Sequence, residues 1–307
     1  MTSPPVHSGG PPVSDRHREL YERVIDALHA LPSRFRTSLR IEGIPAIDLF
    51  TLNTPLGAAI EQSVVDNLND LRSIWDPDNK YDLYNFVRQP QAFPDVRLQT
   101  TAPSKAGAEE VLMGVELKGW FVLAKEGEPS FRYKASPEVC RPHDLIVVYP
   151  WALDEVVSGS PRLLQPFIEE ARYAAEHRNY YWTVLRGITG PDAGIRPAIF
   201  QNPYPNKNDK YNDEAVKDKG SNFGRIARGN LMGDFIDNLM ELPLSGIPAR
   251  HWQSFLHIFA DGVKSAKIEA GLKRIHKQAK QAGANDESLE AIDQLGETIA
   301  LLLKSSK

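Results

Sequence analysis

Two acidic residues and a lysine lie where a buried strand is expected. Asp95 follows Pro94, and further along the chain Glu116 and Lys118 stand inside the nearly continuous apolar run 111–123. A carboxylate and an ammonium are costly to bury unless they are paired or bound to a metal ion. Because residues two apart on a strand point to the same face, Glu116 and Lys118 share one side of it. The pattern therefore indicates either an ion pair or a metal-dependent site.

The same short fragments occur elsewhere in the chain, so their context has to distinguish them. Pro-Asp also occurs at positions 77–78 and 191–192, and acid-x-Lys also occurs at 78–80. The 78–80 fragment lies in a stretch dense in Asp, Pro and Asn, which is typical of a turn. No acid-x-Lys follows positions 191–192. Only the set that begins at Asp95 has its second half on a convincing strand.

Hydrophobic periodicity predicts six elements around these residues. An amphipathic helix is expected over 56–75, because one stripe carries apolar side chains at three- and four-residue spacing: Ile60, Val64, Leu68, Leu71 and Trp75. The remaining elements are expected to be strands over 93–100, 111–125 and 144–151, a helix over 161–177 and a strand over 180–186. The predicted order is thus helix, three strands, helix, strand.

These residues and this order of elements resemble the PD-(D/E)xK nuclease superfamily, to which most type II restriction endonucleases belong. The resemblance covers about residues 54–189. It implies an α/β fold with a restriction-endonuclease-like core, in which a mixed four-stranded sheet is flanked by helices. Additional helices are expected at the C-terminal end of the chain.

The resemblance also implies roles for individual residues. Asp95, Glu116 and the backbone carbonyl of Leu117 would bind Mg²⁺, a hard cation that prefers oxygen ligands. Lys118 would orient the attacking water or stabilise charge that develops on the phosphate. Glu61, on the first helix, would approach a second metal ion or a bridging water. The alternatives are an ordinary Glu116–Lys118 contact on a solvated sheet face and, for Glu61, a surface glutamate on the polar edge of its helix.

His143 is interpreted as a structural residue, and Cys140 limits the kinds of site that the chain can form. His143 has no matching Ser or Cys nucleophile motif, and a histidine at a strand start commonly satisfies local backbone groups. Cys140 is the only cysteine, which excludes an internal disulfide and a zinc–cysteine cluster.

Nucleic-acid binding has to be argued from local charge, because the net charge of the chain is −4. The region of about 200–230 is rich in Lys, Arg, Asn, Gly and Ser, and it suits contacts with phosphates or base edges. The predicted DNA-binding residues are Lys219, Ser221, Asn222, Arg225 and Arg228. A solvated loop is the alternative. A second basic segment, 264–280, is expected to be an amphipathic helix with a packing or dimerisation role.

The chain is expected to divide into three parts. Residues 1–14 have the composition of a flexible tail, 15–260 would form the endonuclease domain and 261–307 a helical extension. The lack of a signal peptide and of a long apolar run predicts a cytoplasmic protein without a membrane span.

The expected activity is Mg²⁺-dependent, sequence-specific cleavage of double-stranded DNA by a type II restriction enzyme. Cutting a palindromic site implies a homodimer, and a cognate DNA methyltransferase would be encoded separately. The alternatives are a repair or recombination nuclease of the same fold and a catalytically inactive DNA-binding relative.

Overall fold

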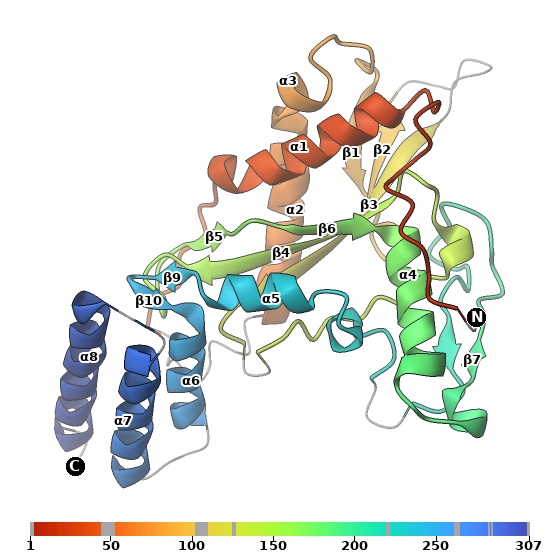
Figure 1. Ribbon diagram of the computed structural model, residues 1–307. Helices are drawn as coiled ribbons and strands as arrows, with labels where there is room; N and C mark the ends of the chain where they lie inside the picture. The colour runs from red at the N-terminus through yellow and green to blue at the C-terminus, as the bar shows by residue number, and fades with distance from the viewer. Residues whose placement is uncertain are drawn as a thin grey trace.

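The computed structural model describes residues 3–43, 53–101, 110–124, 127–218, 222–260, 265–281, 283 and 285–305. Its centre is a mixed sheet of six strands with helices on both sides (Figure 1). The strands of this sheet are β1 (Tyr84–Arg88), β2 (Val96–Thr100), β3 (Val111–Phe121), β4 (Leu145–Leu153), β5 (Pro161–Leu163) and β6 (Phe167–Glu170). The α-helices are α1 (Arg18–Arg34), α2 (Asn53–Asp70), α3 (Arg72–Trp75), α4 (Ala171–Tyr180), α5 (Gly233–Met240), α6 (Ala249–Ala260), α7 (Ser265–Gln281) and α8 (Asp286–Ser305).

Smaller elements complete the architecture. Two short hairpins pair β7 (Ile195–Arg196) with β8 (Glu214–Ala215) and β9 (Pro243–Leu244) with β10 (Ile247–Pro248). The short helical turns are η2 (Pro137–Val139), η3 (Tyr181–Leu185), η4 (Gly190–Ala193) and η5 (Ile226–Gly229).

The strand directions place the two charged segments side by side. β1, β2 and β3 form an antiparallel meander, in which Val96 of β2 lies opposite Val115 of β3. β4 then runs parallel to β3, and a parallel neighbour requires a crossover connection. Residues 122–144 make that crossover, and their described part contains η2. Both β5 and β6 pair antiparallel with β4.

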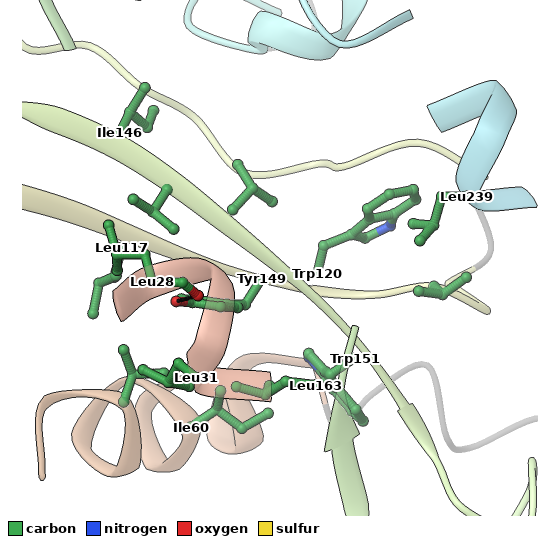
Figure 2. Close-up of a cluster of buried hydrophobic side chains, with 14 of the residues drawn as sticks. Leu28, Leu31, Ile60, Leu117, Trp120, Ile146, Tyr149, Trp151, Leu163 and Leu239 are labelled. Atoms are coloured by element: carbon green, nitrogen blue, oxygen red, sulfur yellow. Dashed lines mark hydrogen bonds between the residues drawn. The ribbon is translucent and has the colours of Figure 1, made fainter. Parts of the chain in front are cut away.

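The central strands are apolar because both faces of the sheet are covered. Every residue of β4 is buried, which matches its unbroken apolar sequence. Figure 2 shows Tyr149 of β4 turned toward Leu28 of α1, whose carbonyl accepts a hydrogen bond from the tyrosine hydroxyl at 2.9 Å. On the opposite side of the sheet, Trp120 of β3 points toward Leu239 of α5. The helices α1 and α2 therefore cover one face, and α5 covers part of the other.

Two predicted elements are wrong. The predicted helix over 161–177 is helical only from Ala171, because residues 161–163 and 167–170 pair with β4 as β5 and β6. Pro166 removes an amide donor and clashes with a preceding helical turn, so a helix could not run through it. The predicted strand over 180–186 is instead the end of α4 followed by the π-helical turn η3. Packing of Trp182 against Phe223, with ring centroids 5.2 Å apart, outweighs the strand propensity of the local sequence.

The strand count also differs from the expectation. The expected α/β class, with a mixed sheet flanked by helices, is confirmed. However, the sheet has six strands instead of four. Strand β1 has no counterpart among the predicted elements, and only one of its five side chains, Phe86, is fully buried. Strands β5 and β6 lie where the sequence predicts a helix.

The N-terminal segment packs against the sheet instead of extending as a tail. The carboxylate of Glu170 accepts hydrogen bonds from the Gly10 amide at 2.6 Å and from the Ser8 hydroxyl at 2.5 Å. His7 lies 2.8 Å from the neighbouring Glu169 carboxylate. Gly10 has φ +89°, and a Cβ there would lie 2.5 Å from the Tyr21 ring, so the contact requires glycine.

The C-terminal helices form a group of their own. α6 packs against α7, and α7 packs against α8 (Figure 1). This group begins at Ala249, earlier than the boundary at residue 261 that the sequence predicts. Within the described part of the chain, no helix has both the length and the apolar character needed to cross a membrane.

Candidate active site

The charged residues singled out in the sequence meet at one end of β2. Glu116 and Lys118 are side by side on one face of β3, and Asp95 immediately precedes β2. The pairing of Val96 with Val115 places Asp95 next to Glu116 on the same face, since side chains alternate along both strands.

Direct contacts join the three side chains. The Lys118 ammonium donates to Asp95 Oδ2 at 2.9 Å and lies 2.6 Å from Glu116 Oε1. Asp95 Oδ2 also accepts the Leu117 amide at 3.0 Å, and the Asp95 amide donates to Glu116 Oε2 at 3.2 Å. One ammonium therefore bridges two carboxylates, and backbone amides fix both carboxylates in place.

The cluster is largely withdrawn from solvent without being sealed. The side chains of Asp95, Glu116 and Lys118 are 28%, 12% and 17% exposed. Burial, together with the negative charge of Asp95, raises the pKa of Glu116 to about 7 despite the opposing effect of Lys118. Burial disfavours the Lys118 ammonium, but the two carboxylates outweigh it and raise the lysine pKa above its usual value. The cluster thus combines a persistent ammonium with a carboxyl group that changes protonation near neutrality.

Glu61 is close enough to take part in the electrostatics of the cluster. It lies on α2 with its side chain 25% exposed, and its carboxylate is 3.6 Å from the guanidinium of Arg88. Burial raises the pKa of Glu61, and the charge of Asp95 raises it further, while Lys118 and Arg88 act in the opposite direction. The side chain is therefore a partly buried group within the field of Asp95 and is not fully solvated.

The donor chemistry suits a hard divalent cation. Asp95 and Glu116 present carboxylate oxygens to a common point, which the Lys118 ammonium occupies. The amide N–H of Leu117 points toward Asp95. The carbonyl of Leu117 points to the same side of β3, because the N–H and C=O of one strand residue both face the same neighbouring strand. No group of three or more His, Cys, Asp or Glu side chains suited to a metal is found among the described residues. Any cation here would depend on two carboxylates, the Leu117 carbonyl and further oxygen donors from solvent or substrate.

A close approach of Pro94 to β3 shapes the site. A Cβ at Gly114 would lie 2.2 Å from Pro94 Cγ and 2.9 Å from Asp144 Oδ1. We expect Gly114→Ala to lower the free energy of unfolding by about 1–3 kcal/mol, because a rigid ring must move aside. Gly119→Ala is the matched control on the same strand, since its added carbon would lie 3.6 Å from Gly57 Cα. Urea unfolding of both variants measures the difference, and equal losses would contradict this explanation.

A buried acid, Asp144, lies beside the cluster and is absent from the predicted site residues. The Asp144 carboxylate accepts hydrogen bonds from the Gly114 and Arg141 amides, both at 2.7 Å, and from the Tyr204 hydroxyl at 3.2 Å. Burial raises the pKa of Asp144 to about 6. Its position at the start of a fully apolar strand was a usable signal. The hydrogen bond with Tyr204, which is sixty residues away, had no usable signal in the sequence.

The predicted DNA-binding residues are brought together only in part. Lys219 and Ser221 lie outside the described residues. Asn222, Arg225 and Arg228 flank or occupy η5, a short 3₁₀ turn. Arg228 bonds to Glu128 at 2.8 Å and also to Asn222. Asn222 and Arg228 line a pocket of about 310 Å³ together with two aromatic residues of η3.

His143 contacts the N-terminal segment, whereas the sequence predicts that it satisfies local backbone groups. Its Nε2 lies 2.9 Å from the Asp15 carboxylate, and its ring packs edge-on against His17. Cys140 is buried, and burial raises the pKa of its thiol. Both residues belong to the packing of the N-terminal segment and the crossover.

No known relative bears on these assignments. Comparisons with protein-family models, curated proteins and solved structures found no match. The residues of the site and their geometry are therefore the basis for any functional assignment.

Proposed function

We propose that this protein is a Mg²⁺-dependent endonuclease that hydrolyses phosphodiester bonds in double-stranded DNA. The observation that carries the proposal is the convergence of Asp95, Glu116 and Lys118 on one partly open place of the sheet. Two carboxyl groups and an ammonium seldom share a largely buried site unless the chemistry requires them. Burying these charged groups lowers the stability of the fold, and this cost points to a functional role.

The arrangement of the elements supports the same proposal. Helix α2 is followed by the antiparallel strands β1, β2 and β3, by a crossover, and by β4 parallel to β3. The resemblance to PD-(D/E)xK nucleases implies the order helix, three strands, helix, strand. In the structure, β2, β3 and β4 correspond to the three predicted strands, β1 is added before them, and α4 corresponds to the second helix. The strand predicted after that helix is a helical turn, η3.

Each residue of the cluster has a chemical task in this reaction. Asp95, Glu116 and the Leu117 carbonyl would hold the cation, which when bound polarises the scissile phosphate and lowers the pKa of a bound water. Lys118 would orient the attacking water or stabilise charge on the phosphate oxygens. Glu61 would accept a hydrogen bond from a water that enters the site, since it keeps a share of exposed surface.

Type II restriction is the specific activity that we propose, with a homodimer cutting a palindromic site and a separately encoded cognate DNA methyltransferase. Asn222, Arg225 and Arg228, with Lys219 and Ser221, would contact the DNA. A repair or recombination nuclease remains the second candidate because the same cluster would serve it equally. A catalytically inactive DNA-binding relative is the third.

End mapping after incubation with mixed genomic DNA tests the proposal. With Mg²⁺, the wild type is expected to produce discrete ends that share one short sequence, and Asp95→Asn is expected to produce none. Ragged ends that disappear in the variant would instead support repair or degradation. Ends unchanged in the variant, or intact DNA across unmethylated and methylated substrates, would refute the catalytic assignment.

A further inference from the structure

A groove of about 560 Å³ lies directly beside Asp95. One wall is the turn that precedes β2, and the other is a loop that begins at Pro205. The lining residues are Gln89, Pro90, Ala92, Arg97, Pro205, Asn206, Lys207, Asn208 and Asp209. The Gln89 amide donates to the Asp95 carbonyl at 2.6 Å, and Arg97 shares a face of β2 with Asp95. The groove therefore continues the surface on which the carboxylate cluster opens.

Contacts within the protein hold the loop wall in place. The Arg97 guanidinium donates to the carbonyls of Pro205 at 2.7 Å and Phe93 at 2.9 Å, and it lies over the Tyr204 ring. Tyr204 has a left-handed backbone conformation, φ 58°, which a bulky residue adopts only where its surroundings fix it. The same residue is anchored through its hydroxyl to Asp144. The loop is thus tied to β2 and to the start of β4.

The tip of the loop leaves polar groups unused. Asn206 and Asp209 close the turn through two hydrogen bonds, at 2.8 and 3.0 Å. The side chains of Asn206, Lys207 and Asn208 are exposed and make no hydrogen bond or ion pair with the described part of the chain. Two amides and one ammonium therefore stand consecutively on a fixed turn.

We propose that this groove reads base edges of double-stranded DNA next to the scissile phosphate, through Asn206, Lys207 and Asn208. Amide side chains match the paired donor and acceptor of adenine, and a lysine matches the two acceptors of guanine in the major groove. The cations Arg97 and Lys207 outnumber the one acid of the lining, Asp209, which suits a polyanion. This inference rests on the proposed function, because only cleavage gives the neighbouring cluster a scissile phosphate.

Selection from a randomised duplex library tests the groove without requiring cleavage. The parent protein is Glu116→Gln, which keeps Lys118 paired with Asp95 and is expected not to cut. Asn208→Ala and Lys207→Gln are introduced separately into this parent. The control is Asn202→Ala, which removes an exposed amide of the same segment outside the groove. Bound duplexes are then sequenced.

Each groove variant is expected to relax the preference at one or two adjacent base pairs by roughly 5- to 150-fold, the range of one base contact. The Asn202→Ala control should keep the parent preference. Uniform weakening across all sequences would show that the groove contacts phosphates only, and it would overturn the inference. An unchanged preference, or no enriched sequence, would overturn it as well.

A parallel digestion with Mg²⁺, by the wild type and by Asn208→Ala and Lys207→Gln made in the wild-type chain, separates the two proposals. Cleavage with a base preference that ignores the groove variants would leave the nuclease proposal standing and reject the groove. If the groove variants change the binding preference and no protein cleaves DNA, the groove proposal would stand and the nuclease proposal would be rejected. The protein would then bind specific DNA sequences without cutting them.

Discussion

Glu116→Gln is expected to reduce Mg²⁺-dependent DNA cleavage at least 100-fold and, at the same time, to make the protein more stable above pH 7. The loss of activity follows from the removal of one of two carboxylates that would hold the cation, since groups that stabilise charge in a transition state contribute about 10²–10³ in rate. The gain in stability follows from the burial of the carboxylate that is removed. The two effects have opposite signs, so misfolding cannot mimic them.

The pH dependence gives the stability effect its sign. The pKa of Glu116 is about 7 in the folded protein against an ordinary value of 4.5, so the folded state holds the proton more tightly than the unfolded chain does. The free energy of unfolding of the wild type should therefore fall as pH rises from about 4.5 to about 7 and then level off. At about 1.4 kcal/mol per pKa unit, this group accounts for a fall of about 3 kcal/mol. A glutamine has no proton to lose, and its variant should lack this part of the fall.

Urea unfolding at a series of pH values between 5 and 8, together with single-turnover cleavage, measures both effects. Glu176→Gln is the control, because Glu176 is paired with Arg172 on α4, away from the cluster. The control should cut DNA like the wild type and keep its pH profile. A Glu116→Gln protein that retains cleavage would remove Glu116 from the mechanism. A profile identical to the wild type would mean that Glu116 is solvated in the folded state.

The cluster could be predicted because two local rules suffice for it. The two-residue period of a strand fixes Glu116 and Lys118 on one face, and the apolar run around them identifies β3. The antiparallel pairing of β2 with β3 places Asp95 beside Glu116, and such pairing is expected for consecutive strands of a meander. In these positions the local sequence and the tertiary structure agree.

The groove and the edge of the sheet could not be predicted, because long-range contacts decide them. Tyr204 reaches Asp144 across sixty residues, and no periodicity marks either residue as a partner. The run 180–186 has strand propensity, yet Trp182 packs against Phe223 from a π-helical turn. The segment containing Gly10 has the composition of a flexible tail, but the buried carboxylate of Glu170 binds its amides. Composition predicts how a segment behaves in isolation. It does not show whether a distant hydrogen-bond acceptor will hold that segment in the folded protein.

Lys118→Met is the second change with a large expected effect, and it tests the metal site without depending on cleavage. At a pH above the pKa of Glu116, the three side chains of the cluster carry a formal charge of −1, from two carboxylates and one ammonium, and the substitution makes it −2. Breaking a buried pair leaves uncompensated charge and costs about 3–5 kcal/mol. We therefore expect a large loss of stability in the absence of divalent ions.

Mg²⁺ should then restore much of the stability of Lys118→Met, because the cation can take the place of the ammonium between Asp95 and Glu116. A ligand that binds only the folded state stabilises it by RT ln(1 + [L]/Kd), so Tm should rise with Mg²⁺ concentration more steeply than in the wild type. Cleavage should stay at least about 100-fold below the wild type, since the charge that the lysine supplies to the reaction is missing. The control Lys118→Arg keeps the positive charge, and its Tm should respond to Mg²⁺ no more steeply than that of the wild type. Thermal unfolding in EDTA and across a Mg²⁺ series measures these responses. If the Tm of Lys118→Met is insensitive to Mg²⁺, the two carboxylates pair only with the lysine. The cluster would then be an ion pair and not a metal site.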